Sequence, residues 1–277
     1  MPDAIGLIQA LHQRVGDVRD VLREAGDAIL DVYANEFAVT IKADKSPVTE
    51  ADTRSSDIVS DGLLALFPNV PVLSEENQDI DYATRRNWKN YWLLDPLDGT
   101  KEFIKRNGEF CINAALMINN QPVAGFIYIP LQRTLYHAIG TGEVVRTDAD
   151  NSTNAFSARA FDKKETLVIA SSRSHGNAKE IEAITKIKAA GYNLGHVNSG
   201  SAIKFCLIAE GKAHMYFRYG PTSEWDTAAG HALLRAVGGD VMGIESRASL
   251  AYNKEQLLNP AFAALGPSVY ELMDYVL

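Results

Sequence analysis

The chain has 277 residues, enough for one large core or two closely joined subdomains, because compact domains rarely exceed roughly 250–300 residues. Hydrophobic residues make up 46% and charged residues 22% of the sequence, a balance that leaves no room for a long disordered tail. A formal net charge of −8 argues against an extended surface for a nucleic-acid polymer, which needs clustered Lys and Arg, but it permits a small nucleotide.

The N-terminal part of the sequence predicts two helices followed by a sheet. Apolar residues recur every three or four positions from Ile5 to Val32, which predicts one long amphipathic helix. Pro47 and Pro68 bound a second helical segment. Short β-rich runs follow, and Asn119-Asn120 between two of them predicts a hairpin in a largely antiparallel sheet. The strands are expected at 72–74, 91–94, 111–118, 122–129 and 134–139.

The C-terminal part alternates strands and helices. Strands are expected at 166–170 and 214–217, and helices at 179–190, 202–209 and 226–237, the last closed by Gly238-Gly239. This order predicts a layered α/β (α+β) fold. Since the sequence has no internal repeat and no low-complexity linker, we expect an α+β half over 1–160 and an α/β half over 161–277 that share an interface.

The start of the chain and the cysteines predict a cytoplasmic protein. The N-terminus lacks the basic flank and apolar run of a secretory signal, and no run of 18 apolar residues predicts an integral membrane segment. Cys111 and Cys206 stand far apart among apolar neighbours, which is typical of buried free thiols rather than of a disulfide or a zinc site. The sequence leaves peripheral association with the inner membrane and the oligomeric state open.

Acidic residues gather where predicted elements begin or end. Glu75-Glu76 and Asp95 each follow a predicted strand, Asp98 comes three residues after Asp95 across a proline, and Asp226 opens a predicted helix. Each feature alone has a simpler interpretation, namely a turn at Asp98-Gly99, a helix cap at Asp226 and a solvated pair at Glu75-Glu76. Together they form a pattern that chance placement explains less easily.

Carboxylates placed close together take up protons unless a cation lies among them. Oxygen ligands without His or Cys favour Mg²⁺ over Zn²⁺. Mg²⁺ takes few protein carboxylates and completes its octahedral coordination with water and substrate phosphate. The acidic pattern therefore predicts a magnesium site that acts on a phosphate.

Four segments around these residues resemble the inositol monophosphatase superfamily of Mg²⁺-dependent, lithium-sensitive phosphatases, and the resemblance runs over nearly the whole chain. They are KSPVTEAD at 45–52, LSEE at 73–76, WLLDPLDGT at 92–100 and WDTAAG at 225–230. Three shorter motifs are similar to the 3′(2′),5′-bisphosphate nucleotidase branch of CysQ type: TKEF at 100–103, SSRSH at 171–175 and GSAIKFC at 200–206. The resemblance implies a five-layered αβαβα sandwich.

The resemblance also implies roles for the acidic residues. It assigns two or three Mg²⁺ ions to the carboxylates of Glu75, Asp95, Asp98 and Asp226 and to the backbone carbonyl of Leu97. The catalytic residues would be Asp52, Glu75 and Thr100, which position and deprotonate a water for in-line attack without a phosphoryl-enzyme intermediate. Leu97, Asp98 and Asp226 would contact the substrate as well, and the Gly99 and Thr100 amides would donate to its phosphate.

A second anion site is expected near residue 200. Ser201 and Lys204 stand three apart at the start of a predicted helix that Ser199 would cap, and Arg218 follows a strand and offers a forked donor. His175 is placed to cover a nucleobase. The alternatives are a surface ion pair for Lys204 and Arg218 and an incidental loop histidine.

Two separated phosphates would fit this layout, and the resemblance names the small-molecule substrate as 3′-phosphoadenosine 5′-phosphate, a by-product of sulfate activation that is hydrolysed to AMP and phosphate. An inositol or sugar phosphate phosphatase of the same fold is the main alternative. Haloacid dehalogenase phosphatases are disfavoured, because their paired aspartates lie two residues apart whereas Asp95 and Asp98 lie three apart. A non-catalytic sensor would not need Asp52 and Thr100, so their presence favours an enzyme.

Overall fold

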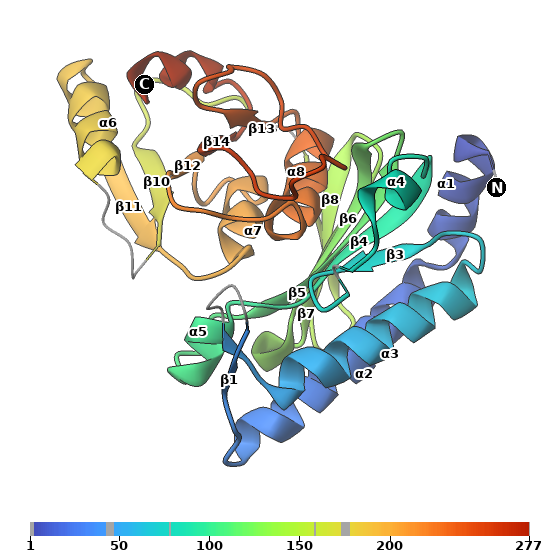
Figure 1. Ribbon diagram of the computed structural model, residues 1–277. Helices are drawn as coiled ribbons and strands as arrows, with labels where there is room; N and C mark the ends of the chain where they lie inside the picture. The colour runs from blue at the N-terminus through green and yellow to red at the C-terminus, as the bar shows by residue number, and fades with distance from the viewer. Residues whose placement is uncertain (1–2, 43–46, 78, 158, 173–177, 277) are drawn as a thin grey trace.

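The structure is a computed structural model that describes residues 3–42, 47–77, 79–157, 159–172 and 178–276. It is a sandwich of five layers (Figure 1). The outer helical layer contains α1 (Ala4–Gln13), α2 (Val15–Ala34) and α3 (Glu50–Leu66), and the middle one α7 (Ile203–Ala209) and α8 (Trp225–Ala236). Helix α6 (Ala178–Ala189) and the 3-10 helix η2 (Tyr270–Tyr275) form the last layer. Two sheets separate these helical layers, so the expected αβαβα sandwich is confirmed.

The first sheet has seven strands in sequence order, of which five were predicted and two, β8 and β9, were not. The strands are β3 (Val72–Ser74), β4 (Asn90–Asp98), β5 (Cys111–Ile118), β6 (Gln121–Ile129), β7 (Thr134–Ile139), β8 (Glu143–Thr147) and β9 (Thr153–Ser157). All neighbours are antiparallel except β3 and β4. The predicted hairpin joins β5 to β6, and Asn119 and Asn120 have φ values of 49° and 59°, as a type I′ turn requires.

The parallel pairing of β3 with β4 determines where the acidic residues lie. Parallel strands end at the same edge of a sheet, so the residues that follow Ser74 and Leu94 are neighbours, and the Glu75 N–H donates to the Leu94 carbonyl over 3.0 Å. The pairing of β4 with β5 shifts register between Asp95 and Asp98. Pro96 lies within this irregular stretch and has no N–H to offer the ladder. The end of β4 therefore leaves the regular sheet at the acidic motif.

The second sheet has five strands in the order β11-β10-β12-β14-β13. They are β11 (Leu194–Asn198), β10 (Leu167–Ser171), β12 (Met215–Arg218), β14 (Phe262–Leu265) and β13 (Asp240–Gly243). Strands β10 and β12 correspond to the two predicted strands, while β11, β13 and β14 were not predicted. The two sheets divide on either side of residue 160, and the assignment of two separate halves stays a prediction.

Short elements complete the fold around the end of β4. They are the two-stranded sheet β1 (Thr40–Ile41) and β2 (Pro47–Val48), α4 (Tyr82–Arg85), α5 (Thr100–Ile104) and the 3-10 helix η1 (Pro130–Gln132). Helix α5 begins directly after Gly99, so the acidic motif ends in a strand-to-helix turn.

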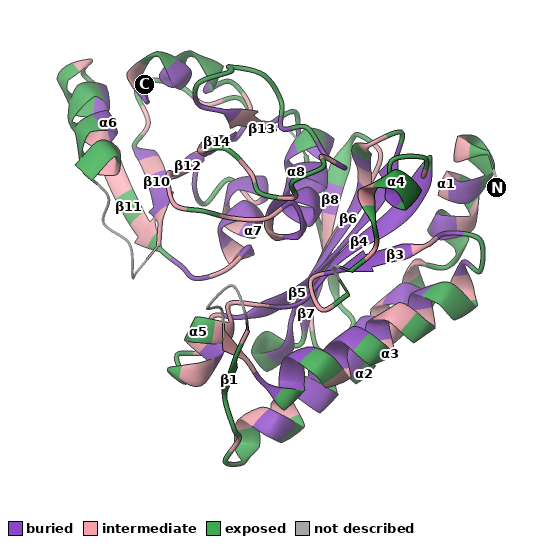
Figure 2. Cartoon of the chain, in the orientation of Figure 1, coloured by how far each residue is buried: buried purple, intermediate pink, exposed green. Residues whose placement is uncertain are grey.

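The core lies on both faces of the seven-stranded sheet, and its strands β4, β5 and β6 are buried almost throughout (Figure 2). Helix α8 packs closely on the inner face at Gly125, where a Cβ atom would lie 2.2 Å from the Ala229 carbonyl oxygen. Only glycine permits that approach. This close packing brings the start of α8 next to the end of β4. Cys111 and Cys206 are buried and free, as predicted.

The single long helix predicted from Ile5 to Val32 is wrong. Arg14 has φ −113° and ψ 13°, outside helical values, and its N–H bonds to the Leu11 carbonyl, so the segment forms α1 and α2. Leu11 and Val18 are both fully buried on either side of the break, and their spacing of seven keeps the apolar period intact. Periodicity therefore does not reveal the break. The second predicted helix is confirmed as α3.

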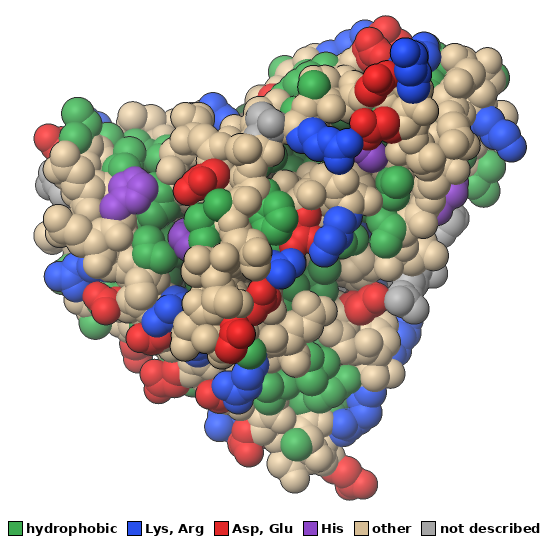
Figure 3. Space-filling view, turned by 180° about the vertical axis from the view of Figure 1, so that it is seen from behind, with side chains coloured by type: hydrophobic (Ala, Val, Ile, Leu, Met, Phe, Trp, Pro, Cys, Tyr) green, Lys and Arg blue, Asp and Glu red, His purple; other side chains and the backbone are tan. Residues whose placement is uncertain are grey.

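Charged side chains of both signs are spread over the surface. On the face shown in Figure 3, basic side chains are interspersed with acidic ones and do not form a continuous basic stripe. No helix in the described part of the chain is long and apolar enough to cross a membrane.

Candidate active site

The first turn of α3 presents Asp52 to the acidic motif. Thr49 is the N-cap residue of α3, and Thr49 and Asp52 form a capping box. Asp52 Oδ2 accepts from the Thr49 N–H over 2.8 Å and from Thr49 Oγ1 over 2.7 Å. The Oδ1 atom then accepts from Thr100 Oγ1 over 3.0 Å. Burial raises the pKa of Asp52, and the hydrogen bonds from Thr49 oppose that shift. Asp52 and Thr100, two of the three residues expected to be catalytic, are thus in direct contact.

The turn after β4 orients the next group of residues. The Leu97 N–H donates to Asp95 Oδ1 over 3.1 Å, and Thr100 Oγ1 also lies 3.2 Å from the Leu97 carbonyl oxygen. Gly99 has φ 94°, and a Cβ atom there would lie 3.0 Å from the Glu109 carbonyl oxygen. Both the backbone conformation and the lack of space therefore exclude a side chain at Gly99.

Asp98 is held from two directions. Its Oδ2 accepts from Asn113 Nδ2 over 3.2 Å and from the Ala202 N–H over 2.6 Å. The second bond links the end of β4 to the segment that leads into α7, more than a hundred residues later in the sequence. The interpretation of Asp98-Gly99 as a plain turn therefore describes only part of what this segment does.

Asp226 reaches the same place from α8. Its Oδ2 accepts from the Ser223 N–H over 2.7 Å, but the N-cap residue of α8 is Glu224 and Asp226 is the second residue of the helix, so the simple interpretation of Asp226 as a helix cap is wrong. One carboxylate oxygen from each of Asp95, Asp98 and Asp226 lies within 4.8 Å of the others. In the described part of the chain, these three residues form the cluster of carboxylate, His or Cys side chains that lie close enough together to hold one ion.

Glu75 lies outside that group of three and pairs with a lysine. The Lys42 ammonium lies 3.3 Å from Glu75 Oε1 and 2.6 Å from Glu76 Oε1. Both glutamate side chains are less than a quarter exposed, at 22% and 15%, so their interpretation as a solvated pair is wrong. Burial raises the pKa of Glu75 to about 7, although the Lys42 charge opposes the shift.

The acidic cluster fits a divalent cation. Burial, followed by the charge of Asp98, raises the pKa of Asp226 to about 8, and burial with the charges of Glu75 and Asp98 raises that of Asp95 well above its usual range. Without a cation these side chains are stable only when partly protonated. A cation among them restores their charge, and an all-oxygen donor set suits Mg²⁺.

Lys204 is buried rather than exposed, which excludes its interpretation as a surface ion pair. Its side chain belongs to α7, the residue is 4% exposed, and Nζ donates to the carbonyls of Ser199 and Ser201 over 3.1 and 2.7 Å. Nζ also lies 4.8 Å from the centre of the Tyr216 ring. Burial lowers the pKa of Lys204 to about 8, against the opposing effect of Asp98.

Arg218, at the end of β12, is the second cation of this region. Its Nε atom is buried and has no hydrogen-bond partner among the residues that the structure describes. The Arg218 charge contributes to the lowered pKa of Lys204, so the two cations repel each other. A buried donor without a partner is costly, and a ligand that accepts from it removes the cost.

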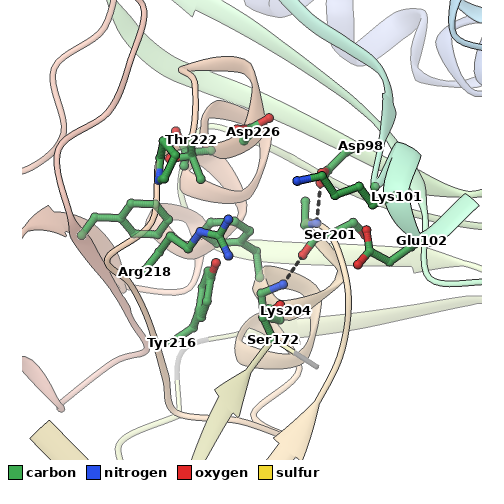
Figure 4. Close-up of a pocket in the computed structure, with 16 residues that line it drawn as sticks. Asp98, Lys101, Glu102, Ser172, Ser201, Lys204, Tyr216, Arg218, Thr222 and Asp226 are labelled. Atoms are coloured by element: carbon green, nitrogen blue, oxygen red, sulfur yellow. Dashed lines mark hydrogen bonds between the residues drawn. The ribbon is translucent and has the colours of Figure 1, made fainter. Parts of the chain in front are cut away.

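One cavity of about 160 Å³ joins these groups (Figure 4). Asp98 and Asp226 line it near the top of the view, and Lys204 and Arg218 lie below them. An adjoining cavity of about 770 Å³ is lined by Glu75 and shares four residues with the first: Lys101, Pro221, Thr222 and Asp226. The structure therefore places carboxylates and cations around one space.

The expectations for Ser199, Ser201 and His175 have different outcomes. Ser199 does not cap α7, because the helix begins at Ile203 and its N-cap residue is Ala202. Ser201 has φ 45°, a left-handed conformation that directs the chain into the helix. Ser201 nevertheless lines the cavity. His175 lies outside the described residues.

The sequence did not predict six further polar residues that line the cavity: Lys101, Glu102, Ser172, Tyr216, Thr222 and Thr227. Lys101 and Glu102 directly follow the acidic motif, and this proximity was the available signal. Ser172 directly follows β10 and Tyr216 lies in β12, and the parallel pairing of these two strands brings the two residues to one side of the cavity.

Comparison with known proteins agrees with this geometry. The chain matches the inositol monophosphatase family over residues 14–273. It belongs to this family. A 3′(2′),5′-bisphosphate nucleotidase CysQ from Escherichia coli O157:H7 is 42% identical over 250 residues, which cover 88% of this chain and 96% of the relative. The CysQ of Haemophilus influenzae is 36% identical over 257 residues, covering 90% of this chain and 91% of the relative.

Solved structures of the family share the fold. The crystal structure of CysQ from Bacteroides thetaiotaomicron, a bacterial member of the family, aligns with a TM-score of 0.78 at 37% identity and covers 92% of this chain and 97% of that one. The suhB protein of Bartonella henselae aligns with a TM-score of 0.76 at 22% identity, covers 95% of this chain and 97% of that one, and supports the fold alone.

Proposed function

We propose that this chain is a magnesium-dependent 3′(2′),5′-bisphosphate nucleotidase that hydrolyses 3′-phosphoadenosine 5′-phosphate to AMP and phosphate. Relatives of that name are 42% identical to it over most of its length. The observation that carries the proposal is a single cavity lined by the carboxylates of Asp98 and Asp226 and by the cations of Lys204 and Arg218. A substrate with two separated phosphates uses both groups, whereas a substrate with one phosphate uses only the first.

The ion-binding residues in this proposal are Glu75, Asp95, Asp98 and Asp226, with the backbone carbonyl of Leu97, and they hold two or three Mg²⁺ ions. Magnesium bound there neutralises phosphate charge and makes a coordinated water more acidic. The acidic cluster and its raised pKa values support this assignment. Glu75 exchanges its contact with Lys42 for the cation in this account.

Thr100 and Asp52 orient the attacking water. The Thr100 hydroxyl donates its proton to Asp52 Oδ1, so the lone pairs of Oγ1 are left to accept a hydrogen bond from the water. Asp52 is itself held by Thr49, which fixes the direction of the Thr100 hydroxyl. Glu75, with a pKa raised to about 7, is poised to accept a proton near neutral pH.

Lys204, Arg218 and Ser201 bind the phosphate that is not hydrolysed. Lys204 has its ammonium fixed by two backbone carbonyls, so it meets the anion in a set position. Arg218 offers the unpaired Nε donor. The anion separates two cations that otherwise repel each other, and it raises the pKa of Lys204 towards its ordinary value. The adenosine lies between the two phosphates in this proposal.

Phosphate release from 3′-phosphoadenosine 5′-phosphate by the purified chain tests this function. Release is expected with Mg²⁺, is lost when a chelator removes the ion, and returns when Mg²⁺ is added back. Release that continues at the same rate in the chelator contradicts the magnesium assignment. No release from this compound, together with rapid release from inositol 1-phosphate, favours the inositol or sugar phosphate phosphatase. We further propose that the substrate is a free nucleotide of the cytoplasm.

A further inference from the structure

The first two turns of α3 carry a polar face that points into the molecule. Thr49, Asp52, Ser55 and Ser56 are 4%, 3%, 0% and 6% exposed, and their spacing of three or four places them on one side of the helix. Later residues on the same helix, such as Val59, are buried and apolar. A buried hydroxyl needs a hydrogen-bond partner, so each of these polar residues is expected to serve a contact.

Ser55 bonds to the irregular end of β4. Its Oγ donates to the Pro96 carbonyl over 2.7 Å in a fully buried position. The ladder between β4 and β5 is interrupted between Asp95 and Asp98, so Pro96 lies where regular pairing is absent. The Ser55 hydroxyl satisfies this carbonyl from the helix instead. It thereby fixes the peptide plane that precedes Leu97, the residue whose carbonyl belongs to the proposed ion site.

Ser56 acts on the neighbouring strand in the same way. Its Oγ lies 3.0 Å from Ser74 Oγ, at the end of β3, and Ser74 Oγ accepts from the Glu76 N–H over 3.3 Å. Ser74 is 1% exposed. The chain of bonds therefore runs from α3 to the turn that contains Glu75.

We propose that Ser55 and Ser56, the α3 hydroxyl pair, are positioning residues for the ion site. Adjacent on one rigid helix, they hold the turn after β4 and the turn after β3 at a fixed separation, so that the Leu97 carbonyl and the Glu75 carboxylate reach the same ion. Neither residue touches the substrate or the reacting atoms. The inference rests on the proposed function, because it takes the ion site from it. Groups that orient metal ligands commonly change metal affinity by about 10–100-fold when they are removed.

Calorimetric titration of the substrate-free protein with Mn²⁺, and separately with Mg²⁺, tests the pair without relying on turnover. Ser55→Ala is expected to weaken binding of the tightest ion by about 10–100-fold. Thr53→Ala, on the exposed side of the same helix, is the matched control and is expected to bind as wild type does. Ser55→Thr keeps the hydroxyl and is expected to restore most of the lost affinity.

Thermal unfolding in the presence of a chelator separates positioning from stability. A folded Ser55→Ala protein that binds the ions as tightly as wild type overturns the proposal, and so does a loss that Ser55→Thr fails to restore. If Ser55→Ala does not fold, Ser56→Ala takes its place, and unchanged ion affinity in that variant overturns the proposal as well. A wild-type protein that binds neither ion refutes the proposed function itself, which distinguishes the two failures.

Discussion

Truncation of Arg218 to alanine separates the second anion site from the ion site. Arg218 Nε is buried without a partner in the described part of the chain, and the side chain lines the cavity opposite Asp98. A hydrogen bond from a charged donor contributes about 1.5–3 kcal/mol. Its loss corresponds to a fall of about ten- to 150-fold in kcat/KM for 3′-phosphoadenosine 5′-phosphate. Inositol 1-phosphate, with a single phosphate, never meets the guanidinium and should be hydrolysed almost as before.

The assay compares kcat/KM for both compounds in wild type, Arg218→Ala and Arg247→Ala. Arg247 is the matched control, since it lies in the same half of the chain, is exposed, and pairs with Asp274 over 2.8 Å. We expect a selective loss in Arg218→Ala and unchanged ratios in the control. Equal losses on both compounds would mean that Arg218 supports the fold or the ion site, and the reasoning from its unpaired donor would fail.

Three further predictions concern the ion site, the catalytic pair and the buried lysine. Asp98→Asn should lower turnover by at least about 100-fold in a folded protein, because the change removes a negative charge that binds the cation. Near-normal turnover in the folded variant would show that Asp98 is not an ion ligand. Thr100→Val should lower kcat by about 100-fold or more while calorimetry shows unchanged Mg²⁺ affinity. A variant that loses only Mg²⁺ affinity would contradict the role of Thr100 in orienting the attacking water. Burial lowers the pKa of Lys204 from 10.5 to about 8, so the unfolded chain binds more protons than the folded chain between these pH values, and stability rises with pH there. The stability of Lys204→Met relative to wild type should therefore decrease by roughly 3 kcal/mol between pH 8 and 10.5 in denaturant unfolding; a difference that does not change with pH contradicts the buried charge.

Much of the fold and the acidic cluster follows from local rules. Pro96, two residues before the end of β4, interrupts the ladder, and Gly99 with φ 94° then turns the chain into α5, so local rules account for the path of the segment from Asp95 to Thr100. The capping box at Thr49 and Asp52 is local in the same sense. The joint role of Asp52 and Thr100, by contrast, was implied by the family resemblance, and their hydrogen bond shows that the two side chains are in contact.

Long-range packing decided what the sequence did not reveal. Nothing in the local pattern around Lys204 distinguishes a buried lysine from an exposed one, and its burial depends on contacts with β12 and with the segment before α7. The break at Arg14 leaves the apolar period unchanged. Strand β14 pairs with its sequence neighbour β13 on one side and with β12 on the other, and because α8 separates β12 from β14 in the sequence, no short-range signal predicts the second pairing.

The central claim is that one cavity serves both an ion-bound phosphate and a second anion. The ratio of kcat/KM for 3′-phosphoadenosine 5′-phosphate to that for inositol 1-phosphate, measured on the wild-type protein in saturating Mg²⁺, tests it most directly. Since the second phosphate adds charge-assisted hydrogen bonds of about 1.5–3 kcal/mol, we expect the ratio to exceed about ten. A ratio at or below one would contradict the claim and favour a phosphatase for inositol or sugar phosphates.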